Sequence, residues 1–135
     1  MIVAAVCLAI LKPSLAGARS QAIVPFAQGK VCPPSRGDIE LRFKWFADGL
    51  GAIEKMPGLY YVDYVRPGER RTGHRVAVIK FEETSLAGRA VYVRVKGYRV
   101  RFPDRLGEDD AEPLPSIRSD LERVLTGLQT EFPCP

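Results

Sequence analysis

Three stretches rich in β-branched and aromatic side chains constrain the fold of this chain most. They are residues 59–65, 75–81 and 90–102. This composition is typical of β-strands, where branched and flat side chains pack well on a pleated surface. Most of the links between the predicted elements are short, which favours antiparallel neighbours. The three stretches therefore predict the body of an antiparallel sheet.

The apolar positions of 90–102 change parity at Gly97. Three precede the glycine and three follow it: Val91, Val93 and Val95, then Tyr98, Val100 and Phe102. A β-bulge shifts parity because it adds one residue to a strand, and glycine inside a strand is common at bulges. We expect a bulge at Gly97 that gathers all six side chains on one apolar face.

Residues 39–45 fit two periodicities. Apolar and charged residues alternate at period two, as in a half-buried strand. A helix capped by Asp38 is the alternative, because Ile39, Phe43 and further apolar residues also fall at helical spacing. A helix would leave Leu41 and Trp45 off its apolar stripe, so we favour the strand.

The C-terminal region has helical spacing. Its apolar stripe is Ile117, Leu121, Val124, Leu125, Leu128 and Phe132. Ser116 or Ser119 is a candidate N-cap, Ser119 and Glu122 fit a capping box, and Pro133 ends the helix. The order of elements predicts an α+β fold: a four-stranded antiparallel meander sheet with one C-terminal helix packed on one face, in a single domain over residues 38–135.

The N-terminal residues predict export. Residues 2–11 are an apolar run, shorter than the roughly 20 residues that a membrane-spanning helix needs. Pro13 and the small residues Ala16-Gly17-Ala18 follow, which is typical of a signal peptide over residues 1–18. No basic residue precedes the run, so a short buried strand is the alternative. Residues 19–37, with several prolines and glycines, predict an extended segment.

The cysteines fit an exported protein. Of three cysteines, Cys7 falls in the predicted signal peptide, and Cys32 and Cys134 remain. An even pair in an exported chain predicts a disulfide, here closing the domain from one end to the other. Two separate reduced thiols are the alternative. Two cysteines and one histidine without close spacing do not predict a metal site.

No residues form a recognisable catalytic group. The single histidine, His74, lies in a predicted basic loop, and Asp63 is expected to face solvent. Glu82 and Glu83 are adjacent on a strand and point to opposite faces, so they cannot flank one bond. We therefore expect no catalytic residues, no cofactor and no metal.

Two groups of basic residues are candidates for binding. The first, together with Tyr92, is expected to share one sheet face: Arg94, Lys96, Arg99 and Arg101. The second comprises Arg70 and Arg71 of the loop at residues 66–73. Aromatic and arginine side chains are enriched at protein-binding hot spots. Alternatively, Glu82 or the acidic residues 108–112 neutralise the cations within the protein.

These features predict a small exported binding module. It would act by protein contact, without catalysis, in the bacterial periplasm or outside the cell, and an acidic protein is the expected partner. Nucleic acid is excluded by the export signal, and the membrane is met only during export. The alternatives are an accessory subunit of an envelope or secretion complex and a carboxylate-dependent enzyme acting on a glycan.

Overall fold

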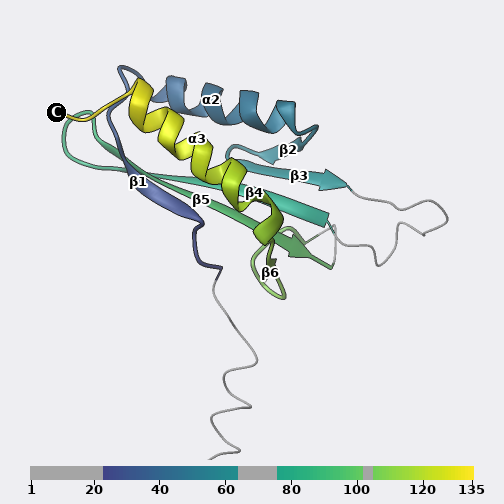
Figure 1. Cartoon of the computed structure of the whole chain (residues 1–135). Coiled ribbons are helices and arrows are strands. Elements are labelled where there is room, and N and C mark those ends of the chain that lie inside the picture. The colour runs from purple at the N-terminus through teal and green to yellow at the C-terminus, as the bar shows by residue number, and fades with distance from the viewer. Residues whose placement is uncertain (1–22, 64–75, 102–104) are drawn as a thin grey trace, which may run out of the picture.

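The computed structural model describes residues 23–63, 76–101 and 105–135, which together form an α+β domain. Its strands are β1 (Ala27–Val31), β2 (Ile53–Met56), β3 (Leu59–Asp63), β4 (Val76–Ser85), β5 (Val91–Val100) and the short β6 (Glu112–Pro113). They form an antiparallel sheet in the order β1-β5-β4-β3-β2, with β6 also paired to β5. Helices α2 (Arg36–Gly49) and α3 (Arg118–Glu131) lie on the same face of this sheet (Figure 1).

The α+β class and the antiparallel sheet are confirmed, whereas the count of four strands and one helix is wrong. The predicted stretches 59–65, 75–81 and 90–102 overlap β3, β4 and β5. One missed strand, β1, lies inside the segment expected to be only extended. It pairs with the first half of β5, from Ala27 opposite Val95 to Val31 opposite Val91. β1 thus pairs with β5 on the side opposite β4 and adds an edge strand that the sequence analysis does not predict.

Residues 39–45 belong to a helix, so the strand prediction is wrong and the helical alternative is right, but the N-cap is Ser35 and the predicted cap, Asp38, lies in the first turn. The carboxylate of Asp38 accepts a hydrogen bond of 3.2 Å from the backbone N–H of Ser35 and closes the first turn. Ile39, Phe43 and Ala47 are buried. Leu41 and Trp45 lie off this stripe, as the helical spacing required, and are 41% and 55% exposed. The helix therefore forms on its buried stripe and leaves two large apolar residues at the surface.

The main core lies between the two helices and the sheet. Val91, Val93 and Val95 of β5 form one cluster with Leu121, Leu125 and Leu128 of α3, as predicted, and Val124 is partly buried beside it. Helix α3 crosses β1 and β5, while α2 lies over the β2 side of the sheet (Figure 1).

The predicted bulge at Gly97 is absent, because β5 keeps a regular register with β4 from Val91 to Val100. Tyr98 and Val100 therefore lie on the face away from the helices, where they join a second buried cluster with Ile23, Val76, Val78 and Leu106. The Tyr98 hydroxyl donates a hydrogen bond of 2.9 Å to the carbonyl oxygen of Leu106. The apolar parity changes because the sheet is covered on different faces along its length. Phe102 lies outside the described residues.

Helix α3 begins without the predicted serine cap. Its N-cap is Ile117, preceded by a 3₁₀ turn over Pro115–Ile117, so Ser119 lies inside the helix and the capping box is wrong. This start brings Ile117 and Leu121 against Gly97. A Cβ atom at Gly97 would lie 2.5 Å from the δ-methyl of Ile117. Glycine at this position thus permits the close approach of α3 rather than a change of strand register.

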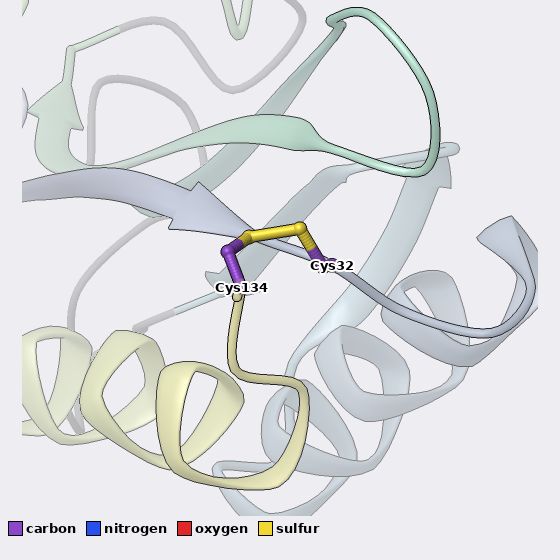
Figure 2. Close-up of a disulfide and its surroundings, with 2 residues drawn as sticks. All are labelled: Cys32 and Cys134. Carbon is purple, nitrogen blue, oxygen red and sulfur yellow. A yellow bond between two sulfur atoms is a disulfide. The ribbon is translucent and has the colours of Figure 1, made fainter.

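Cys32 and Cys134 are bonded to one another, with their Cα atoms 5.0 Å apart (Figure 2). Cys32 follows β1 and Cys134 follows α3, so the bond joins the link between β1 and α2 to the C-terminal end of the described domain. Beside it, the backbone N–H of Cys32 donates to the carbonyl oxygen of Phe132 at 2.9 Å. The predicted signal peptide, residues 1–18, lies outside the described residues.

Candidate functional site

The structure divides the predicted basic residues between different places. Tyr92, Arg94 and Lys96 alternate along β5 on the face without helices. Arg99 lies on the opposite face, with Gly97, because no bulge resets the parity. The shared face expected for all four cations is therefore wrong. Arg101 is exposed just after the end of β5. Arg70, Arg71 and His74 lie outside the described residues.

Lys96 is held by two carboxylates rather than free for a partner. Its Nζ lies 2.8 Å from Glu108 Oε1 and 3.0 Å from Glu82 Oε1, and its side chain is only 12% exposed. Lys80 lies 3.8 Å from both carboxylates. Burial works to lower the pKa of Lys96, but the hydrogen bonds with Glu108 and Glu82 raise it overall. Here the alternative of internal neutralisation is correct.

Arg94 and Arg99 also have contacts within the protein. The Arg94 guanidinium lies 5.1 Å from the ring centroid of Tyr92. Arg99 Nη2 lies 3.2 Å from the Glu112 carboxylate on the neighbouring β6. Whether Arg94, Arg99 and Arg101 contact an acidic partner stays a prediction.

Lys96→Met should weaken the acid dependence of stability. Burial works to raise the pKa of Glu82, but Lys96, with Lys80 and Arg94, lowers it overall. A lowered pKa stabilises the fold above the unfolded pKa of glutamate, about 4.3, and this contribution is lost as pH falls through the folded pKa. Urea unfolding should show that the free energy of unfolding falls less between neutral and acidic pH in Lys96→Met than in the wild type; we call this fall the acid loss. The difference should be less than about 1 kcal/mol, because the pair is partly exposed.

The exposed Lys30 of β1 offers a matched control for this substitution. Lys30→Met removes a cation from the same sheet face and should leave the acid loss as in the wild type. An acid loss in Lys96→Met equal to that of Lys30→Met would show that the ion pair does not couple to folding.

A groove that sequence reasoning missed lies between α2, the turn joining β2 to β3, and β4. Its volume is about 490 Å³, within the range of pockets that hold ligands. Polar and apolar groups from four elements line it: Glu40, Leu41 and Lys44 of α2, Glu54 of β2, Tyr60 of β3 and Glu83 of β4. Charged and apolar side chains therefore meet in one groove, which the sequence pattern does not predict.

Aromatic rings and one glycine shape the floor of the groove. The Phe43 and Phe81 rings stack with centroids 3.9 Å apart, and Tyr60 meets Phe81 edge-on at 5.9 Å. Gly58, with φ of 83°, lies so close to β4 that a Cβ atom there would be 2.5 Å from the Phe81 carbonyl oxygen. Glycine lets the turn take this left-handed conformation and approach. The groove is thus built on rigid, packed elements.

The groove has a negative electrostatic character. Burial raises the pKa of Glu83, and the charge of Glu40 raises it further, against a smaller opposing effect of Arg36. Burial likewise raises the pKa of Tyr60 to about 12, with the charge of Glu54 and a hydrogen bond to it adding to the shift. The charge of Glu40 thus acts on both Glu83 and Tyr60, and that of Glu54 acts on Tyr60, across a shared space.

Glu83 illustrates what the sequence could and could not indicate. Glu82 contacts Lys96 on one sheet face, and Glu83 lines the groove on the other, as the strand parity predicts. The strand predicted over residues 39–45 contains Glu40 and Lys44, so this prediction gives no helical wall for the groove. The helical spacing of Ile39, Phe43 and Phe46, with Asp38 before them, was the signal that could have placed α2 there.

No protein-family model, curated protein or solved structure matches the chain. Within residues 23–63, 76–101 and 105–135, no group of three or more histidine, cysteine, aspartate or glutamate residues is placed to hold a metal ion. No helix in these ranges is long and apolar enough to cross a membrane. The function is therefore inferred from the groove and the exposed residues of the domain.

Proposed function

We propose that the chain is a small exported binding module that acts through protein contact, without catalysis, in the bacterial envelope or outside the cell. The groove between α2, the β2–β3 turn and β4 is the observation that carries this proposal. It is large enough to receive side chains of a partner, and Leu41 at its wall is 41% exposed. Trp45 and Met56 nearby along α2 and β2 are 55% and 57% exposed. Exposed aromatic and methionine side chains are enriched at protein interfaces.

Export is supported by the apolar N-terminal run and by the disulfide. Disulfides form and persist in oxidising compartments, the periplasm among them. We expect the mature chain to start near Arg19. Intact-mass measurement on protein recovered from the periplasm or medium should show loss of residues 1–18 and of two hydrogens. A chain that stays in the cytoplasm with residues 1–18 attached would overturn the export part of the proposal.

Site-specific photo-crosslinking in the producing cell tests the binding part. A photoreactive amino acid at position 41 should form a discrete adduct with a protein. The matched control is position 86, because Leu86 is also a leucine, is 42% exposed and lies outside the groove. Adducts of equal yield at both positions, or none at position 41, would contradict a binding role for the groove.

An accessory role in an envelope or secretion complex is distinguished by the identity of the crosslinked protein. A subunit of such a complex would favour that role, and a single soluble enzyme would favour an inhibitor or immunity role. Both are forms of protein contact, so the crosslinking experiment serves both.

A carboxylate-dependent enzyme acting on a glycan is the second candidate. Glu40 and Glu83, two carboxyl groups from different elements that line one groove, favour it, because glycoside hydrolysis uses a pair of carboxyl groups. Turnover of a glycan by the wild type that Glu83→Gln abolishes would replace the binding proposal.

A further inference from the structure

The charges that line the groove are unbalanced. Glu40, Glu54 and Glu83 come from three different elements, and Lys44 is the cation among the lining residues. The raised pKa of Glu83 reports repulsion from Glu40 as well as burial. A cation bound between these carboxylates would relieve that repulsion, so the groove complements a positively charged group.

The floor of the groove is apolar and aromatic. Phe43, Tyr60 and Phe81 form it, and Leu41 extends the apolar surface along the wall. A simple inorganic cation would leave most of this apolar floor without a contact. Lysine and arginine side chains have an apolar stem and a charged end, and cations are also attracted to aromatic faces. The groove therefore matches a long basic side chain better than a bare ion.

The strand beside the groove is an edge strand. β2 ends the sheet order and pairs with β3 on one side, and all four of its residues are exposed. Edge strands offer unpaired backbone groups to which an extended peptide can add. Ile53 and Met56 of β2, 52% and 57% exposed, provide apolar contacts for further residues of such a peptide.

We infer that the groove receives a lysine or arginine side chain from an extended, basic and apolar segment of the partner protein. This inference rests on the proposed function and specifies the chemistry of the partner. The carboxylates of Glu54 and Glu83 bind the charged end, and the aromatic floor contacts its stem. The contact differs from the one predicted between an acidic partner and Arg94, Arg99 and Arg101, none of which lines the groove.

A peptide titration tests the inference. The probe is a terminally blocked hexapeptide of alternating valine and lysine, and the reference peptide has glutamine in place of lysine. Isothermal titration calorimetry, or chemical shifts followed by NMR, should give at least about tenfold weaker binding for the glutamine peptide. Affinity for the lysine peptide should fall as salt is raised, because the contacts are charged and partly exposed.

Glutamine substitutions locate the binding. The double variant Glu54→Gln, Glu83→Gln should bind the lysine peptide at least about tenfold more weakly than the wild type. Glu122→Gln is the matched control, because Glu122 is an exposed glutamate on α3, away from the groove. It should leave the affinity unchanged. Thermal unfolding of each variant confirms that the fold is retained.

Two results would overturn the inference. One is equal affinity for the lysine and glutamine peptides. The other is the absence of saturable lysine-peptide binding up to about 1 mM, a weak limit for a specific contact. If either occurs while the position-41 adduct still forms, the binding module stands and only the partner chemistry is wrong. If the adduct is absent, the proposed function itself fails.

Discussion

Replacing Cys32 and Cys134 together with serine should lower the free energy of unfolding by about 4–5 kcal/mol. The two residues are 102 positions apart, and in the chain-entropy model a cross-link closing a loop of about 100 residues restricts the unfolded chain by that amount. The bond also fixes the end of α3 beside β1, both of which contribute to the main core. Urea unfolding of the oxidised wild type and the double variant measures the difference.

Reduction provides the control for this prediction. Dithiothreitol should destabilise the wild type by about the same amount and leave the double-serine variant unchanged. A variant with the wild-type unfolding midpoint would show that the bond contributes nothing to stability. A variant that does not fold at all would agree with the predicted direction, and reduction of the folded wild type would then give the magnitude.

Leu121→Ala should lower the free energy of unfolding by about 3–5 kcal/mol. Its side chain is fully buried in the main core. Truncation of such a leucine to alanine typically lowers the free energy of unfolding by about 2–5 kcal/mol. The upper part of that range is expected because Leu121 packs against Gly97. Glycine has no side chain that could move into the cavity left behind.

Leu86→Ala is the matched control, since it makes the same change at a position that is 42% exposed. Its cost should stay below about 1 kcal/mol. Urea unfolding of the two variants under one condition gives the comparison. Equal losses would mean that α3 does not pack on the sheet through Leu121.

The central strands and the C-terminal helix were predictable because their apolar side chains are buried in a core. The dense β-branched runs of β4 and β5 and the apolar stripe of α3 each face a core, so composition and spacing agree. Residues 39–45 were not predictable in this way. Their apolar positions fit both the period of a strand and that of a helix. The strand was favoured because it places Leu41 and Trp45 on its apolar face, whereas the helix leaves both exposed. Arg42, 4.7 Å from the Trp45 ring centroid, covers part of that exposed surface.

The parity change in β5 has a cause that a single strand cannot reveal. Val95 is buried by α3 on one face, and Tyr98 is buried by Ile23 and Leu106 on the other. Helix α3 and Ile23 are remote from β5 in sequence, and Leu106 follows Tyr98 by eight residues across a loop, so the pattern of the strand alone resembled a bulge. The groove was out of reach for the same reason, because its walls come from α2, β2 and β4. The pairing of the cysteines, by contrast, followed from their number once Cys7 was set aside with the predicted signal peptide.

The pairing of β1 with β5 determines when the domain can fold. β1 emerges first among the described elements, yet its only strand partner in the described sheet is the Val91–Val95 half of β5, and its inner face is covered by the last helix. A chain delivered from its N-terminus therefore cannot complete the sheet until nearly its whole length is present. Contacts between such distant segments slow folding, because a long loop must close before they form. The topology thus makes the β1 edge of the sheet the last part to form, after β5 has been synthesised.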